Sequence, residues 1–254
     1  MACQNRAMQE LHERVAVVTG AASGIGLAVT EAFVRQGMRI VMADLNQEGL
    51  DSHSRRLTDE GAQVVSIVVD VRDPGAVAAA GQKAIDMFGS LHVAVNNAGV
   101  VCRGYSWELP LEEWHRVIDV DLWGVIHGVR SFVPLILASG KEGHVVNIAS
   151  MAAVSPLDRL GPYSVAKHGV LGLTDVLRAE LSAMGAPVGA SVVMPGMIRT
   201  AMNPIGSVEP SAVAANVVDA IRRDRHYVFT DDHSKMEVER RLQSILSSRS
   251  EVCS

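Results

Sequence analysis

Cysteine is scarce in this 254-residue chain, and long apolar or charged runs are missing. Cys3, Cys102 and Cys253 are an odd number with no spacing typical of a metal or redox site, which indicates a reduced, cytoplasmic protein. The polar start MACQNRAMQELHER has no apolar core, so we expect no secretory signal. No stretch reaches the roughly 18 consecutive apolar residues of a membrane helix, and we expect no membrane partner.

Charge of one sign is also weak. The net charge is −5 and no basic run is present, which argues against a nucleic-acid partner. Hydrophobic residues make up 48% of the chain, too many for a disordered protein. Without a repeat or linker, we predict one domain over 13–246, an extension over 1–12 and a flexible tail over 247–254.

Apolar runs alternate with helical patterns along the whole chain. Strands are predicted at 15–19, 39–43, 63–69, 91–95, 144–149, 188–194 and 227–230. Helices are predicted at 25–36, 46–60, 75–88, 111–138 (one helix or two), 163–184, 211–223 and 233–246. This alternation predicts a single doubly wound α/β domain with a mostly parallel seven-stranded sheet and helices on both faces. Ligands of such a sheet bind at the carboxyl ends of its strands.

A glycine-rich turn follows the first predicted strand, in the segment Thr19-Gly20-Ala21-Ala22-Ser23-Gly24-Ile25-Gly26. Its glycines allow a close backbone approach to a pyrophosphate, and the next helix offers free N–H groups there. The spacing is wider than G-x-G-x-x-G, and a turn without a ligand stays an alternative. The expected contacts are Gly20, Ser23, Gly24, Ile25 and Gly26.

Two acidic residues extend this predicted site. Asp44 ends the second strand, where a carboxylate accepts hydrogen bonds from an adenosine ribose and repels a 2′-phosphate, so it predicts NAD rather than NADP. The alternative role of Asp44 is a helix N-cap. Asp70 and Val71 close the third strand and are expected beside the adenine, although Asp70 could equally cap a turn.

Further motifs follow in order: Asn96-Asn97-Ala98-Gly99, Ser150 after the fifth strand, Tyr163 with Lys167, and Pro195-Gly196 before Thr200. With the glycine loop, the chain from about 13 to 200 resembles the short-chain dehydrogenase/reductase family. The resemblance implies a Rossmann-type domain that binds a nicotinamide dinucleotide. It assigns cofactor contacts to Asn97, Ala98, Gly99, Tyr163, Lys167, Pro195, Gly196, Ile198 and Thr200.

Acid–base chemistry is expected from Tyr163 and Lys167, which share one helix face at a spacing of four residues. A free phenol has a pKa of about 10, and a neighbouring ammonium favours its phenolate form. Tyr163 could then exchange a proton with an alcohol while hydride moves to or from the nicotinamide. Ser150 can reach the same crevice and hydrogen-bond the substrate oxygen. The resemblance gives Ser150, Tyr163 and Lys167 these roles.

One position departs from the family pattern. The family has a catalytic Asn in the long helix, and Asp121 is the matching residue here. The resemblance assigns its main-chain carbonyl to a water that links the lysine to a proton relay, and that carbonyl survives the change. Because an added carboxylate near Lys167 could shift the pH optimum, we include Asp121 with the catalytic residues.

The substrate pocket is expected from segments after the fourth, fifth and sixth strands, with Ser150, Ala152, Cys102, Met197 and Met202 as candidate contacts. These residues are mostly apolar, which suits an alcohol or ketone with an apolar body. The segment 202–209 is short for a lid. The site is therefore expected to be open, or covered by the carboxyl-terminal helix of this or a neighbouring subunit.

The sequence thus predicts an NAD-dependent oxidoreductase that interconverts a secondary alcohol and a ketone, with an apolar or steroid-like substrate favoured. An alternative is a dinucleotide-binding sensor without turnover, and a third is an epimerase acting on nucleotide sugars, which would need a longer chain. The histidines form no cluster with metal-ligand spacing, so no metal is expected. The resemblance implies a homodimer or homotetramer that pairs through the helices at 111–138 and 163–184.

Overall fold

The computed structural model describes residues 6–155 and 157–248. Seven parallel strands form one sheet in the order β3-β2-β1-β4-β5-β6-β7. The strands are β1 (Val15–Thr19), β2 (Arg39–Asp44), β3 (Val64–Val68), β4 (Val93–Asn96), β5 (Gly143–Ile148), β6 (Val188–Met194) and β7 (Tyr227–Phe229). The predicted doubly wound fold is confirmed, and the strand order reverses between β1 and β4.

The described part of the chain has eight α-helices, of which seven lie between strands and α8 follows β7. They are α1 (Gly24–Arg35), α2 (Gln47–Asp59), α3 (Pro74–Phe88), α4 (Leu111–Ile118), α5 (Gly124–Ala138), α6 (Gly161–Ala183), α7 (Pro210–Arg223) and α8 (Asp232–Ser247). A π-helical turn, Asp119–Trp123, joins α4 to α5, so the region 111–138 forms one helical run with a local widening. The predicted boundaries of the regular elements agree to within about two residues.

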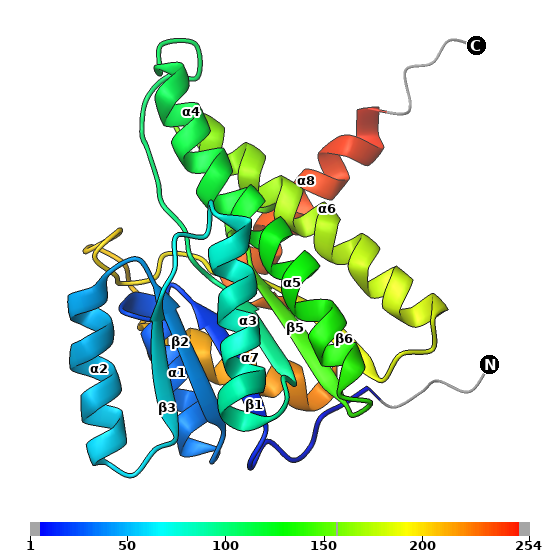
Figure 1. The fold of residues 1–254 in the computed structure, drawn as a ribbon. Helices are drawn as coiled ribbons and strands as arrows, with labels where there is room; N and C mark the ends of the chain where they lie inside the picture. The colour runs from blue at the N-terminus through cyan, green and yellow to red at the C-terminus, as the bar shows by residue number, and fades with distance from the viewer. Residues whose placement is uncertain (1–5, 156, 249–254) are drawn as a thin grey trace.

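Both faces of the sheet are covered, as the continuous apolar strands predict. Along β1, Ala16 and Val18 join the core under α1 and α7, whereas Val15 and Val17 join the core under α3, α5 and α6. Figure 1 shows α3 and α5 in front of the sheet and α1 and α7 behind it. The crossovers leave the carboxyl ends of the strands along one edge, where the connecting loops meet.

The segment expected as an extension before residue 13 contributes to this core. Met8 and Leu11 are buried with α1 and α7, and the Met8 amide donates to the Ile221 carbonyl. The domain therefore begins before the predicted boundary. Residues 1–5 of the predicted extension and residues 249–254 of the predicted tail lie outside the described residues.

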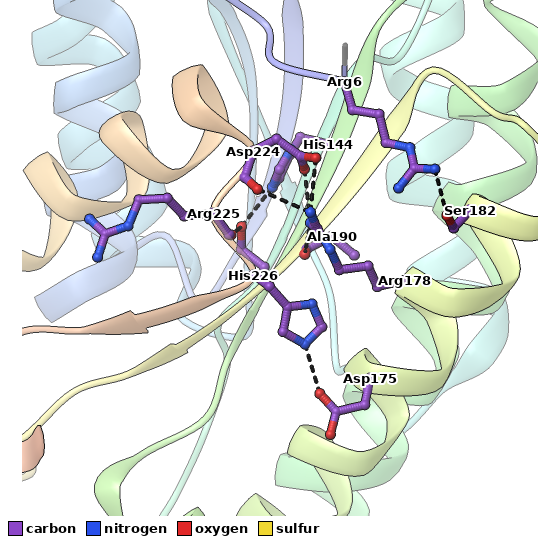
Figure 2. A network of polar contacts seen from close by, with 10 residues as sticks. Arg6, His144, Asp175, Arg178, Ser182, Ala190, Asp224, Arg225 and His226 are labelled. Atoms are coloured by element: carbon purple, nitrogen blue, oxygen red, sulfur yellow. Dashed lines mark hydrogen bonds and ion pairs between the residues drawn. The ribbon is translucent and has the colours of Figure 1, made fainter. Parts of the chain in front are cut away.

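A polar network fixes α6 to the sheet far from the strand ends that hold the candidate site (Figure 2). The two terminal guanidinium nitrogens of Arg178 on α6 donate to the two carboxylate oxygens of Asp224, at 2.8 and 2.9 Å. Arg178 also donates to the Ala190 carbonyl of β6. His226 contacts Asp175, which lies one helical turn before Arg178 on α6, at 2.7 Å. These contacts set the position of α6, which carries Tyr163 and Lys167 at its other end.

The helical run Leu111–Ala138 is long and apolar enough, by length and composition, to cross a membrane. Core helices of globular domains have the same properties. Val125, Phe132 and Ile136 of this run are buried against the sheet and its neighbouring helices.

Candidate active site

A cavity of about 560 Å³ lies at the carboxyl ends of the strands. Its wall begins at the loop after β1, passes the ends of β2 and β3, and continues along the loops after β4, β5 and β6. Of the residues predicted to bind a cofactor, all but Gly26 line it: Gly20, Ser23, Gly24, Ile25, Asp44, Asp70, Val71, Asn97, Ala98, Gly99, Tyr163, Lys167, Pro195, Gly196, Ile198 and Thr200. One continuous cavity thus joins motifs that are far apart in sequence.

The glycine loop has a backbone that side chains would disturb. Gly20 and Gly24 have φ of +65° and +54°, in the left-handed region that favours glycine. The loop is tied to the end of β4, because the Asn97 side-chain amide donates to the carbonyls of Thr19 and Gly20 at 2.9 and 3.2 Å. The loop leads into the amino terminus of α1, whose first N–H groups are available to an anion.

Gly26 does not line the cavity, but the packing of the loop requires a glycine at this position. A Cβ added there would lie 2.0 Å from the Gly20 carbonyl oxygen and 2.6 Å from Asn97 Nδ2. No rotamer removes that overlap, because the carbonyl is backbone. Gly26 therefore lets the first turn of α1 pack directly on the loop, which holds the loop in shape.

Asp44 points its carboxylate at this loop. One oxygen accepts from the Ala22 amide at 2.9 Å and the other accepts from the Asn46 amide at 2.9 Å. The N-cap of α2 is Asn46, whose side chain accepts from Gly49, so Asp44 is not the helix cap. The carboxylate is fixed by main-chain donors and still lines the cavity.

Asp70 and Val71 lie beyond the end of β3, which stops at Val68, so the expectation that they close the strand is wrong. Asp70 pairs with Arg72 at 2.6 Å and accepts from the Arg72 amide, as the alternative role in a turn predicts. The hydrogen bond from Arg72 lowers the pKa of the Asp70 carboxyl below its ordinary value. Both residues nevertheless line the cavity next to Asp44.

The other end of the cavity contains a buried ion pair. Lys167 Nζ lies 3.2 Å from Asp121 Oδ2, and the two side chains are 4% and 0% exposed. Lys167 also donates to the Ile148 carbonyl at the end of β5, at 3.1 Å. The Val100 amide donates to the second Asp121 oxygen at 2.7 Å. The Asp121 side chain therefore contacts Lys167 directly, whereas the family resemblance assigns a role only to its main-chain carbonyl.

The π-helical turn at 119–123 brings Asp121 into this position. Insertion of one residue into a helical turn rotates the local side chains, and such turns are frequent at functional sites. Gly99 makes room for the result, because a Cβ there would lie 3.3 Å from Asp121 Oδ2. The lack of a side chain at Gly99 thus leaves room for the Asp121 carboxylate.

Burial and charge act in opposite directions on the pair. Burial alone would lower the pKa of the Lys167 ammonium, but Asp121 and Tyr163 more than offset this, so the pKa of Lys167 lies above its ordinary value. Burial raises the pKa of the Asp121 carboxyl, and Lys167 and the Val100 amide offset part of that rise. Lys167 is therefore a cation whose position depends on its buried partner.

Ser150 and Tyr163 line the cavity beside Lys167. The Lys167 nitrogen lies 5.5 Å from the centre of the Tyr163 ring. Ser150 caps the short 3-10 turn Met151–Ala153, and its hydroxyl oxygen accepts from the Ala152 amide at 3.1 Å. That contact uses the oxygen as an acceptor, so the hydroxyl hydrogen is left for another partner.

The Pro195-Gly196 turn covers the cavity from the β6 side. The Pro195 carbonyl accepts from the Met151 amide at 3.0 Å, which joins the loops after β5 and β6. Further along, Ile198 pairs with Val208 in an isolated bridge, and Thr200 exchanges main-chain hydrogen bonds with Asn203. Ile198 and Thr200 line the cavity from this compact loop.

The expected substrate residues are only partly on the wall. Ser150, Met197 and Met202 line the cavity, whereas Ala152 and Cys102 are absent from the described lining residues. Both are buried, and burial raises the pKa of the Cys102 thiol. Sequence reasoning placed them by position after a strand, which does not determine whether a side chain lines the cavity. It also missed several lining residues: Leu45, Arg72, Arg103, Arg116, Leu157, Leu160 and Asn203.

The short loop after β6 covers part of the cavity by itself, with Ala201, Met202 and Asn203 on the wall. Among the described residues, none of α8 lines the cavity. The helix packs beside it, with Val238 on the core near Met194 and Arg241 donating to His168 of α6.

Comparison with known proteins gives consistent results. A profile described as short chain dehydrogenase matches residues 14–207. The 1-deoxy-11-beta-hydroxypentalenate dehydrogenase of Streptomyces avermitilis is 39% identical over 87% of this chain and 86% of its own length, and that of Streptomyces exfoliatus is 37% identical over 90% and 86%.

A crystal structure of a short chain dehydrogenase/reductase from Burkholderia phymatum in complex with NAD superimposes with a TM-score of 0.92. It is 30% identical, and the match covers 97% of this chain and 99% of that one.

The packing of the glycine loop gives a prediction about stability. Gly26→Ala forces the α1 turn away from the Gly20 carbonyl and should lower the free energy of unfolding by about 3 kcal/mol or more. Gly172→Ala is the matched control, because a Cβ at Gly172 meets nothing within 4 Å. It should raise the unfolding free energy by about 0.5–1 kcal/mol through helix propensity. Urea unfolding followed by circular dichroism measures both, and equal effects would contradict the packing described here.

Proposed function

This chain belongs to the short-chain dehydrogenase/reductase family and is an oxidoreductase that acts on hydroxyl groups, and on that premise we propose that it uses NAD to interconvert a secondary alcohol and a ketone. The favoured substrate is apolar or steroid-like. One observation carries the proposal: Ser150, Tyr163 and Lys167 line one end of a cavity whose other end holds the glycine loop and Asp44.

The cavity fits a dinucleotide in its residues. The glycine loop and the start of α1 offer main-chain donors to a pyrophosphate. Asp44, held by the Ala22 and Asn46 amides, offers carboxylate oxygens to an adenosine ribose. Asp70 and Val71 would flank the adenine, and Asn97, Ala98, Gly99, Pro195, Gly196, Ile198 and Thr200 would hold the nicotinamide half. When bound, NAD supplies the site that accepts or returns the hydride.

Tyr163 is the proposed acid and base. Its phenolic oxygen takes the alcohol proton as the carbinol is oxidised, and returns a proton to the carbonyl oxygen in reduction. The buried Lys167 ammonium favours the negative phenolate during this exchange. A general base of this kind contributes on the order of 10²–10⁴-fold to rate.

Ser150 orients the substrate oxygen. Because its own oxygen already accepts from the Ala152 amide, the Ser150 hydroxyl still has its hydrogen to donate. Donation of that hydrogen to the substrate oxygen stabilises negative charge on the oxygen during the reaction. The hydroxyl is buried, so little water competes for it.

Lys167 has a second proposed task. An ammonium has three N–H donors. The Ile148 carbonyl takes one and the Asp121 carboxylate attracts another, which leaves one for the ribose hydroxyls of the nicotinamide half. Asp121 is therefore a positioning residue: it holds the ammonium in place and compensates its charge.

We also propose a homodimer or homotetramer in the cytoplasm. Leu111 on α4, Trp123 before α5, and Val165 and Val176 on α6 are exposed apolar side chains on the helices expected to pair. The free Cys102 thiol is consistent with a reducing compartment. Cys102 and Ala152, which do not line the cavity, remain proposed substrate contacts.

Removal of the phenol tests the reaction. Tyr163→Phe should reduce kcat for secondary alcohols by about 10³-fold, because it removes the proton acceptor, while NADH still binds with nearly unchanged affinity. Tyr227→Phe is the control, since its phenol contacts Asp175 on the far side of α6. Steady-state rates at 340 nm and NADH fluorescence titration give the two quantities. Binding of NADH without turnover in the wild type over a broad ketone panel would instead support the dinucleotide sensor.

Cofactor choice is tested at Asp44. The wild type should prefer NAD to NADP by about 100-fold or more, because the carboxylate repels a 2′-phosphate. Asp44→Asn keeps an acceptor for the Ala22 amide but loses the charge, so the preference should fall about tenfold. Asp51→Asn on the outer part of α2 should not change it. A wild-type preference for NADP would refute the role of Asp44.

The buried pair predicts a change in pH dependence. In Asp121→Asn, the raised pKa of Lys167 falls toward or below its ordinary value, so activity is lost at a lower pH on the alkaline side. The alkaline side of the kcat/KM profile should therefore shift to lower pH. Asp119→Asn, in the same π-helical turn, is the control. Superimposable profiles of wild type and Asp121→Asn would remove the positioning role.

A further inference from the structure

One cationic side chain at the substrate end of the cavity has no partner among the residues that the structure describes. Arg103 lies in the loop after β4, is exposed, and lines the cavity. The next residue, Gly104, forms a bridge with Leu160, which stands directly before α6 and also lines the wall. Arg103 is therefore on the side of the cavity near Tyr163 and away from Asp44.

The other charges at this end are compensated. Arg116 makes three bonds to Glu113 and donates to the Val101 carbonyl. Lys167 is paired with Asp121. In the described part of the chain, Arg103 has neither a hydrogen bond nor an ion pair to another residue, so this end of the cavity carries one uncompensated positive charge.

Most of the other side chains on the wall around that charge are apolar. Besides the catalytic side chains, the paired Arg116 and Asn203, the wall is formed by Val100, Val101, Leu157, Leu160, Met197 and Met202. A substrate with an apolar body fits these side chains. A purely apolar substrate leaves the guanidinium with water alone, whereas an anionic group on the substrate forms charge-assisted hydrogen bonds with it.

We propose that the substrate alcohol also carries a carboxylate, and that Arg103 binds this carboxylate and so determines specificity. The proposal rests on the function proposed above, because it places the hydroxyl at Tyr163 and Ser150. A guanidinium matches a carboxylate in charge and geometry through two parallel N–H bonds. Arg103 thus fixes one end of the substrate while the reacting hydroxyl lies at the other.

The test uses pairs of substrates that differ only in this charge. One pair is a bile acid with a ring hydroxyl and its methyl ester, and a smaller pair is 4-hydroxycyclohexanecarboxylate and its methyl ester. For each pair, the ratio of kcat/KM for acid and ester is measured in the wild type, Arg103→Gln and Arg103→Lys. Arg35→Gln, an exposed arginine at the end of α1, is the control for loss of one charge.

We expect the wild type to favour the acid of at least one pair, and Arg103→Gln to reduce the acid-to-ester ratio by about tenfold. Arg103→Lys should retain part of the preference, and Arg35→Gln all of it. NADH titration of each variant confirms that the folded dinucleotide site is present.

Turnover without an acid preference, or a ratio that Arg103→Gln leaves unchanged, overturns the role of Arg103 but leaves the proposed oxidoreductase function intact. Absence of turnover for both pairs and for all simple secondary alcohols, with NADH bound, contradicts the proposed function and this inference together.

Discussion

The buried contact between Lys167 and Asp121 connects the main parts of the site. Asp121 comes from the widened turn between α4 and α5, Lys167 from α6, and the Ile148 carbonyl from the end of β5. A buried ammonium without a counter-ion would lose its proton or move toward water. The carboxylate keeps the cation in the protein interior, next to the ring of Tyr163. The electrostatic state of the proposed base therefore depends on a residue from another helix.

The fold supports this contact from both ends of α6. At one end, Lys167 is held by Asp121 and the strand terminus; at the other, Arg178 pairs with Asp224 and donates to β6 (Figure 2). The parallel sheet brings the loops after β1, β4, β5 and β6 to the same edge. Asn97 then ties the glycine loop to the β4 end, so cofactor and substrate regions are fixed to a common framework.

The sheet and many of the residues that line the cavity could be predicted, because they depend on buried apolar runs, a glycine-rich turn and motifs such as the Tyr-Lys spacing that carry the family resemblance. Contacts set by side-chain direction could not. Met8 and Leu11 lie in a polar segment yet pack into the core. Cys102 follows the correct strand but is buried and does not line the cavity, while its neighbour Arg103 does. The direct approach of Asp121 to Lys167 depends on a π-helical turn, which has no distinct sequence pattern.

The charge state of Lys167 is the most direct test of this account, and the chain has only four lysines, at 83, 141, 167 and 235. Nitrogen-15 labelling of lysine allows each side-chain signal to be followed through a pH titration, with Lys167→Arg to assign the signal of interest. We predict that Lys167 gives an ammonium signal protected from water exchange and still charged above about pH 10.4, the ordinary lysine pKa. A neutral amine near pH 7, or exchange as fast as for the other lysines, would contradict the buried ion pair.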